Sequence, residues 1–268
     1  MGLGCVQQPY TSDLTASQWQ GIENLICVKR KSIWPLQQVV ESIFYVTKNG
    51  VIWRDLPRCF PPWPTVYWYF RKWAKDDTWL LIANELTMLE RLKVDKHPLP
   101  TAAIIDSQSV KNTPTATEQI GFDGGKLIKG RKRMVVVDTM GHVLWADVRP
   151  ANVHDGKAGI LLWEQAHLLN PVMEDIKVVY ADGTFGGHFK TQLELIEDMK
   201  VVITRSPIEE QPLDGKMVIH KWRWIVERTL AWLGNNRRLA KDYERTTLSA
   251  QTFIWIAHIR RTLKRVWI

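Results

Sequence analysis

The apolar pattern of this chain changes near residue 100, and the change constrains the fold more than any other feature. Before it, apolar residues recur at helical spacing between Pro and Gly breaks; after it, short β-branched runs alternate with helical stretches. Strands are predicted at 102–106, on both sides of a turn at 138–141, at 177–181 and at 201–204. Helices are predicted at 155–169, 188–199, 222–233 and 250–267. The order β-β-β-α-β-α-β-α indicates an α/β fold with a mixed sheet flanked by helices.

The charge of the chain is unevenly distributed. The net charge is +8, from 36 Lys and Arg against 28 Asp and Glu. Residues 216–268 hold 12 basic and 3 acidic side chains, whereas residues 96–215 hold 13 and 16 and residues 1–95 hold 11 and 9. A basic segment beside an acidic one is typical of a metal-assisted enzyme acting on a polyanion, because carboxylates hold cations while Lys and Arg hold phosphates. A well-solvated basic tail is the alternative.

Residues 1–95 predict an all-helical domain that precedes an α/β domain at 96–268. Its helices are expected from a capping box at Thr15–Gln18 towards Ile26, from Pro35 to a stop at Gly50, through Tyr67, Phe70 and Trp73, and from Asp77 towards Lys93. The third helix carries Arg71, Lys72 and Lys75, which are candidates for DNA contact in a helix-turn-helix-like module. A plain helical bundle that mainly dimerises explains the same pattern.

The cysteines Cys5, Cys27 and Cys59 form neither a disulfide framework nor a metal-ligand spacing. No secretory signal or apolar stretch of membrane-spanning length accompanies them. We therefore expect a cytoplasmic protein with no membrane partner, whose thiols are buried and inert.

Three acidic residues stand in positions typical of a metal site. Asp106 closes the apolar run AAIID, Asp182 closes VVYAD ahead of a glycine-rich turn, and Glu227 follows Arg223 by one helical turn. Side chains at the ends of strands commonly meet ligands, and an arginine beside a carboxylate can grip a phosphate. Three carboxylates can hold two Mg²⁺ ions about 4 Å apart, which supports in-line displacement at phosphorus. Taken singly, each Asp also fits a turn or cap, and Glu227 fits a surface ion pair.

Around these residues the chain resembles a known family. The strings IDSQSVK at 105–111, GRKR at 130–133, VRPANVHD at 148–155, ADGTFGG at 181–187 and WIVERTLAWL at 224–233 are similar to those of DDE transposases of bacterial insertion sequences, in the insertion sequence 5 family. The stretch GVIWRDLPRCFPPWPTVYWYFRKW at 50–73 extends the resemblance over nearly the whole chain.

The resemblance implies an RNase H-like catalytic core in which Asp106, Asp182 and Glu227 are the catalytic residues and metal ligands. The implied reaction is hydrolytic nicking at the ends of the element, followed by attack of the freed 3′-OH on target DNA. The implied cofactor is Mg²⁺, with Mn²⁺ as a substitute and two ions in the site. The implied partners are double-stranded terminal inverted repeats, target DNA and further copies of the chain, as a homodimer or higher oligomer associated with the nucleoid.

The chain departs from the family pattern around the glutamate. Related transposases carry Tyr-x2-Arg-x3-Glu-x6-Lys, and here the arginine and the glutamate match. His220 stands in place of the tyrosine and Gly234 in place of the lysine. We expect Arg237 and Arg238 to supply the missing charge.

Other candidates for DNA contact are basic or aromatic. The turn expected at 126–133 contributes Lys129, Arg131, Lys132 and Arg133, and the helix of the glutamate contributes Arg223 and Arg228. An ordinary solvated loop is the alternative for that turn. Trp222 or Trp224 could stack on an unpaired base. The pair His154-Asp155 fits metal ligands, but we expect Asp155 to cap the helix that follows.

Two other functions fit the same residues. A structure-specific nuclease of this fold would cut DNA without joining the 3′-OH, and a catalytically silent DNA-binding protein would be expected to lack one of the three acids. Serine and tyrosine recombinases fit less well, because no nucleophile has the required context. All three acids are present, which favours the transposase.

Overall fold

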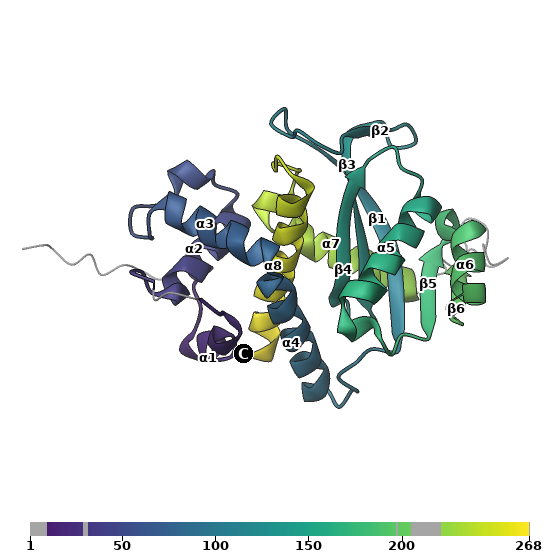
Figure 1. Ribbon diagram of the computed structural model, residues 1–268, viewed down its shortest axis with the longest axis horizontal. Helices are drawn as coiled ribbons and strands as arrows, with labels where there is room; N and C mark the ends of the chain where they lie inside the picture. The colour runs from purple at the N-terminus through teal and green to yellow at the C-terminus, as the bar shows by residue number, and fades with distance from the viewer. Residues whose placement is uncertain (1–9, 29–31, 197, 205–220, 268) are drawn as a thin grey trace, which may run out of the picture.

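The computed structural model describes residues 10–28, 32–196, 198–204 and 221–267 (Figure 1). Its N-terminal part is helical, as predicted, with α1 (Ala16–Gln20), η1 (Glu23–Leu25), α2 (Leu36–Asn49), η2 (Trp53–Asp55), α3 (Trp63–Lys75) and α4 (Thr78–Lys93). Thr15 and Gln18 form the expected capping box, but α1 ends at Gln20 instead of continuing towards Ile26. Gly50 takes a left-handed φ of 71° at the end of α2, so the predicted stop is confirmed.

Within the described residues, six strands form one mixed sheet. They are β1 (Ala102–Lys111), β2 (Gly121–Asp123), β3 (Ile128–Asp138), β4 (Val143–Pro150), β5 (Val178–Asp182) and β6 (Lys200–Thr204). β1 is antiparallel to β3 on one side and parallel to β5 on the other, where β6 continues the parallel part. β2 and β4 both pair with β3. The order β4-β3-β1-β5-β6 is the RNase H-like arrangement, so the predicted fold class is confirmed.

The first hairpin is longer than the sequence pattern predicts. β1 continues to Lys111, past Asp106, where its end is predicted. Its partner β3 begins at Ile128, so most of the basic stretch expected to be a turn lies in a strand, and the short strand β2 is additional. The cause is pairing between distant segments, from Ala103 opposite Asp138 to Lys111 opposite Gly130, which local periodicity does not reveal.

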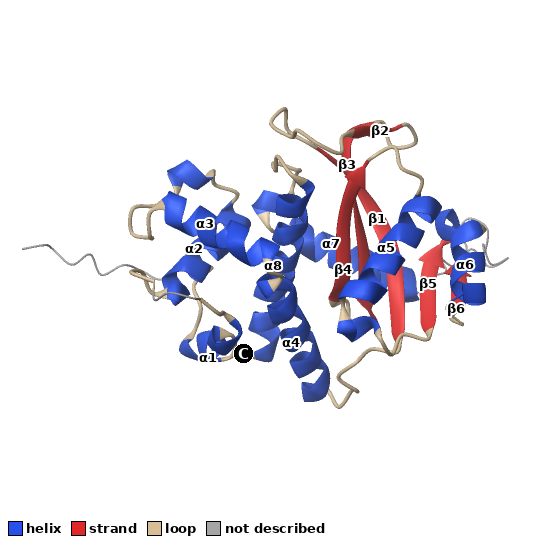
Figure 2. Cartoon of the chain, in the orientation of Figure 1, coloured by secondary structure: helices blue, strands red, loops and turns tan. Residues whose placement is uncertain are grey.

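Helices cover both faces of the sheet (Figure 2), with α5 (Asp155–Leu169) in front of the strands and α7 (Lys221–Gly234) behind them. The short helix α6 (His188–Ile196) packs beside α5 and β6. Alternation along β1 sends neighbouring side chains to opposite faces. Ser107 accordingly donates to Asp155 of α5, whereas Asp106 lies on the face covered by α7.

The last helix, α8 (Thr247–Val266), lies between the N-terminal helices and the sheet (Figure 1). Its Phe253 stacks on Phe70 of α3 with ring centroids 4.8 Å apart. On the other side, Gln251 donates to the carbonyl of Ala146 in β4 at 2.6 Å. One hydrophobic core therefore connects helices from the start of the chain to the sheet through α8. None of the helices in the described part of the chain has the length and apolar content needed to cross a bilayer.

Candidate active site

Asp106 and Asp182 lie side by side on adjacent parallel strands. β1 and β5 pair in register up to Ile105 opposite Ala181, and the two aspartates follow directly. Neighbouring strands are about 4.8 Å apart, and both side chains point to the same face. The Ser107 backbone N–H donates to Asp106 at 2.7 Å, and the Thr184 backbone N–H donates to Asp182 at 2.9 Å. Both carboxylates are thus held at the point where β5 ends.

Glu227 approaches the two aspartates from α7. The first turn of this helix is held against β5 by Trp222, which stacks on Tyr180 with ring centroids 4.4 Å apart. Arg223 and Val226 of the same helix line a small pocket together with both aspartates. The Glu227 side chain is 52 % exposed and pairs with Arg223, whose Nε lies 2.8 Å from Oε1.

The electrostatics of the pocket couple Asp106 to the other two acidic residues. Burial raises the pKa of Asp106 to about 6; the Ser107 hydrogen bond and Arg223 lower it, whereas the charges of Asp182 and Glu227 raise it. The Asp106 carboxyl group is therefore close enough to Asp182 and Glu227 for their negative charges to affect its pKa. The excess negative charge is of the kind that a bound cation relieves.

All three acidic side chains offer oxygen donors, the ligand type that Mg²⁺ and Mn²⁺ prefer. In the described part of the chain, however, no three His, Cys, Asp or Glu side chains are already grouped for a metal ion. Glu227 is directed to Arg223, so a complete ligand set requires this side chain to change its rotamer. The sheet and α7 bring the three acids near one another, and the ion pair with Arg223 sets how Glu227 is oriented.

The pair His154-Asp155 has a different role from the one expected. His154 is the cap of α5, since its ring Nδ1 accepts from the Gly156 backbone at 3.2 Å. The expectation that Asp155 caps this helix is therefore wrong. Asp155 pairs with Lys132 at 2.7 Å and accepts from Ser107 at 2.9 Å, so it supports β1 from the face opposite to Asp106.

Thr184 is a site residue that the sequence interpretation misses. Its hydroxyl donates to both Asp182 and Asp155, and thereby connects the second aspartate to the start of α5. The available signal is its position two residues after Asp182, the spacing of a turn closed by an Asp side chain.

Four of the predicted DNA-contact residues are exposed: Arg71, Lys75, Lys129 and Arg237. Lys72 is half-buried and pairs with Asp76 at 2.7 Å. Arg228 lies between Trp224 and Trp232, 4.4 Å from each ring centroid. Arg223 is the Glu227 partner described above. These residues remain candidates for DNA contact.

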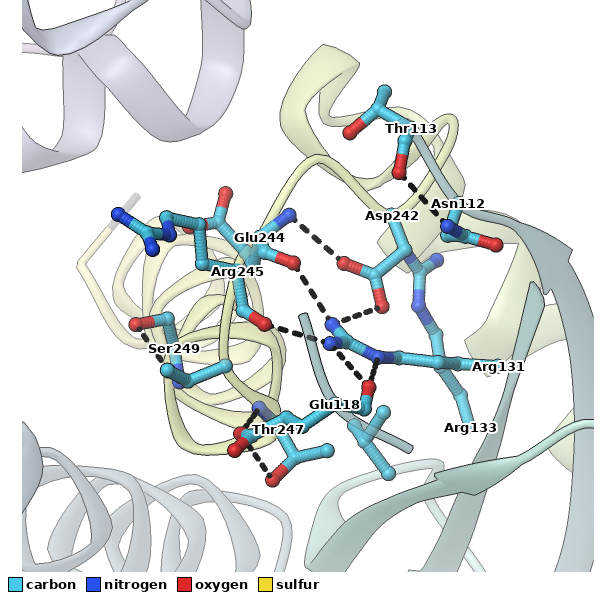
Figure 3. Close-up of polar contacts among 12 residues, drawn as sticks. Asn112, Thr113, Glu118, Arg131, Arg133, Asp242, Glu244, Arg245, Thr247 and Ser249 are labelled. Carbon is cyan, nitrogen blue, oxygen red and sulfur yellow. Dashed lines mark hydrogen bonds and ion pairs between the residues drawn. The ribbon is translucent and has the colours of Figure 1, made fainter. Parts of the chain in front are cut away.

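The other predicted DNA contacts are buried. Arg131 is 0 % exposed and lies among Asp242 and the backbone carbonyls of Glu118, Glu244 and Arg245 (Figure 3). Three more are buried with protein partners: Lys132 with Asp155, Arg133 with the carbonyls of Leu239 and Lys241, and Arg238 with Glu244. These four join β3 or η5 (Arg237–Leu239) to neighbouring segments, so we do not retain them as DNA contacts.

The burial of Arg238 also corrects the idea that it replaces the lysine missing at Gly234. Arg238 Nε lies 2.7 Å from Glu244 Oε1, and its guanidinium also donates to the Val51 carbonyl. Arg237 is exposed and is the remaining candidate of the two. His220, the other departure from the family pattern, lies outside the described residues.

The cysteines differ from expectation as well. Cys27 and Cys59 are free and exposed, so the prediction of buried thiols is wrong for both. Cys5 lies outside the described residues.

The fold is RNase H-like, and the match to a family model identifies a transposase of the DDE class. The chain belongs to the transposase DDE domain family, which matches residues 97–262, and residues 14–83 match the family described as putative transposase of IS4/5 family. The resemblance stated from the sequence is thereby confirmed.

Two solved structures are similar at low identity. The Mos1 transposase paired-end complex with left transposon end is 12 % identical, with 89 % of this chain and 80 % of that chain covered and a TM-score of 0.27. The Mos1 strand transfer complex is 10 % identical, with 88 % and 79 % covered and a TM-score of 0.26. No curated protein matches the chain.

Proposed function

We propose that this protein cleaves DNA at the ends of an insertion sequence and joins the freed 3′-OH to target DNA, with Asp106, Asp182 and Glu227 as the catalytic residues. The observation that carries the proposal is the pairing of Asp106 and Asp182 on adjacent strands, with Glu227 on the helix that faces them. Membership of the DDE transposase family supports it.

The three carboxylates fit Mg²⁺ or Mn²⁺, since their donors are all oxygen. Burial, and to a smaller extent the charges of Asp182 and Glu227, raise the pKa of Asp106 to about 6. When bound, such ions lower the pKa of water and stabilise the entering and leaving oxygens at phosphorus. Asp106 and Asp182 hold their carboxylates in place through backbone hydrogen bonds. Glu227 completes the set when it leaves Arg223, and the freed guanidinium then faces a phosphate oxygen.

The two reactions share one site. In the first, water attacks phosphorus at the element's end and the bond to the 3′-oxygen breaks, which leaves a 3′-OH and a 5′-phosphate. In the second, that 3′-OH attacks a phosphodiester of the target, its proton goes to solvent, and the target strand leaves with its own 3′-OH. The second reaction needs no energy source, because one phosphodiester replaces another.

The partners follow from the same proposal. They are double-stranded terminal repeats and target DNA, with at least two copies of the chain in the paired-end complex and a cytoplasmic, nucleoid-associated location. We also propose the division into a helical domain at 1–95, which reads DNA or dimerises, and a catalytic domain at 96–268. The packing of α8 against α3 and α4 supports a fixed orientation between the two.

A strand-transfer assay tests this function against a nuclease of the same fold. A labelled duplex carrying the DNA that flanks the gene is incubated with the protein, Mg²⁺ and a supercoiled plasmid. The transposase predicts label joined covalently to plasmid DNA. Cleaved duplex with no joined product would identify a nuclease, and no cleavage at all would favour a catalytically silent DNA-binding protein.

A further inference from the structure

A basic cleft of about 470 Å³ lies between α2, α7 and α8, beyond the pocket of the carboxylates. Its cationic lining residues are Lys48, Arg260, Arg261, Lys264 and Arg265, and no described residue that lines it is acidic. α2 comes from the start of the chain, and α7 and α8 come from its end. The cleft is therefore created by the packing of the helical part against the last helices.

The cations of the cleft are only partly neutralised inside the protein. Arg265 pairs with Glu90 at 2.6 Å. The pKa of Lys48 is lowered, first by burial and then by the charges of Arg260 and Lys264, so these cations face one another. A cleft that concentrates uncompensated positive charge attracts an anion.

An arginine that lines the cleft also has a donor without a partner. Nη2 of Arg261 is buried and makes no hydrogen bond within the described part of the chain. Unpaired buried donors are costly, so native proteins rarely leave them without an acceptor. Phosphate oxygens accept hydrogen bonds without donating any, which suits a site lined by guanidinium and ammonium groups.

Stacked side chains connect the cleft to the catalytic residues. Arg228 lies over Trp224 and Trp232, 4.4 Å from each ring centroid, and Arg261 lies 3.6 Å from the Trp232 centroid. Trp224, Arg228 and Trp232 recur every fourth residue along α7, so they form one stripe next to Glu227. Alternating arginine and aromatic side chains are typical of surfaces that follow a nucleic-acid strand.

The distance along α7 suits a continuous DNA strand. A helix rises 1.5 Å per residue, so Asn235 at the cleft lies about 12 Å along the axis from Glu227. A duplex advances about 3.4 Å per nucleotide along each strand. A strand with one phosphate at Glu227 would reach the cleft about three to four nucleotides away.

We propose that this cleft binds the phosphodiester backbone of the DNA duplex whose scissile phosphate lies at the carboxylates. The inference rests on the proposed function for the identity of that duplex. The cleft supplies backbone affinity at a distance from the reacting atoms, and it needs no base contact.

The test uses the full chain with Lys48 and Lys264 both changed to Gln. Neither lysine forms an ion pair among the described residues, so the change removes charge without exposing a buried partner. Binding of a fluorescein-labelled mixed-sequence duplex of ~30 base pairs is measured by anisotropy in EDTA at several KCl concentrations. We expect affinity to fall roughly tenfold and the slope of log affinity against log salt to fall by about 2.

A charge-matched control is available at the opposite end of the parallel strands. Lys177 and Lys200 are exposed at the amino ends of β5 and β6, away from Asp182, and their double Gln variant should bind like wild type. The Lys48→Arg/Lys264→Arg variant retains charge and should also bind like wild type. The proposal would be contradicted if the Lys48/Lys264 and Lys177/Lys200 double Gln variants bound DNA equally well. It would also be contradicted if the Lys48→Arg/Lys264→Arg variant lost as much affinity as the Lys48→Gln/Lys264→Gln variant.

A further experiment distinguishes failure of the cleft proposal from failure of the proposed function. Cleavage of the flanking-DNA duplex by wild type and by Asp106→Asn is measured in parallel, in Mg²⁺. If wild type does not cleave while the Lys48→Gln/Lys264→Gln variant still loses binding, the proposed function is wrong and the cleft stands. If cleavage depends on Asp106 but the Lys48/Lys264 and Lys177/Lys200 double Gln variants have the same DNA affinity, the proposed function stands and the proposal that the cleft binds DNA is wrong.

Discussion

Arg223 and Glu227 hold each other across one turn of α7, with Nε 2.8 Å from Oε1, beside the two aspartates of the sheet. The side chains are 37 % and 52 % exposed, so their separation costs at most about 1 kcal/mol. In the proposed reaction this ion pair separates. Glu227 would then bind a metal cation, and Arg223 would bind a phosphate of the DNA.

This exchange predicts opposite effects of Arg223→Ala on metal binding and on catalysis. Loss of the arginine frees Glu227, so Mn²⁺ affinity measured by calorimetry should rise. Loss of the phosphate contact should lower the cleavage rate at saturating Mn²⁺ by roughly 10- to 100-fold. Arg149→Ala, a half-exposed arginine paired with Asp147 on β4, serves as the control. Unchanged Mn²⁺ affinity in Arg223→Ala would contradict the exchange.

The acidic site predicts that Asp106→Asn, Asp182→Asn and Glu227→Gln each reduce cleavage by at least about a thousandfold. DNA binding should persist, because each change removes a metal ligand and no Lys or Arg. Cleavage of a labelled duplex and anisotropy are measured on the same preparations. Glu174→Gln, at an exposed position in the turn before β5, should retain full activity. Near-normal cleavage by any one of the three variants would remove that residue from the site.

The oxygen-only ligand set predicts that cleavage requires Mg²⁺ or Mn²⁺. Ca²⁺ should support DNA binding but little cleavage, because its larger and more flexible coordination shell misplaces the reacting oxygens. Excess chelator should stop cleavage, and added Mg²⁺ should restore it. Full activity in chelator would eliminate the metal mechanism.

The raised pKa of Asp106 predicts how stability depends on pH without metal. Its value of about 6 in the folded protein exceeds the ordinary 3.8, so the folded state binds the proton more tightly than the unfolded state. The stability that protonation supplies is therefore lost as pH rises from about 4 to 6. At pH ~7.5, Asp106→Asn should be more stable than wild type by about 1–3 kcal/mol in urea denaturation with EDTA. Added Mg²⁺ should reduce this difference. A variant less stable than wild type at pH ~7.5 would refute the assignment.

The burial of Arg131 predicts a structural effect where the sequence suggests DNA contact. Arg131→Met removes the ion-pair partner of Asp242 and one donor from each of three carbonyls, and it should cost about 3–5 kcal/mol of unfolding free energy. Lys129→Met, two residues away and exposed, should change stability by less than about 0.5 kcal/mol. Thermal and urea denaturation distinguish the two. Equal stability of both variants would show that the hydrogen bonds of Arg131 contribute nothing to the free energy of unfolding.

Many elements of the fold depend on residues that are close together in the sequence, so they can be predicted from it. Helix caps such as the Thr15–Gln18 box and the stop at Gly50 depend on residues within one turn of each other. The strands that lead to Asp106 and Asp182 are recognisable because apolar β-branched runs bury on a sheet. The register of parallel neighbours then brings the two aspartates together, as the pattern implies.

Only the tertiary structure decides which charges are free. GRKR reads as an exposed basic turn, yet Arg131 and Arg133 are buried because carbonyls more than a hundred residues later in the chain accept their hydrogen bonds. Burial of a charge depends on such distant partners, and a single sequence does not display them. The same holds for the cleft, whose Lys48 meets Lys264 only because α8 packs against α2. The sequence alone indicated most of the order of elements and singled out the three acids proposed for the site. The long-range packing determined their surroundings, because contacts between distant segments set the burial, the hydrogen-bond partners and the local field of each side chain.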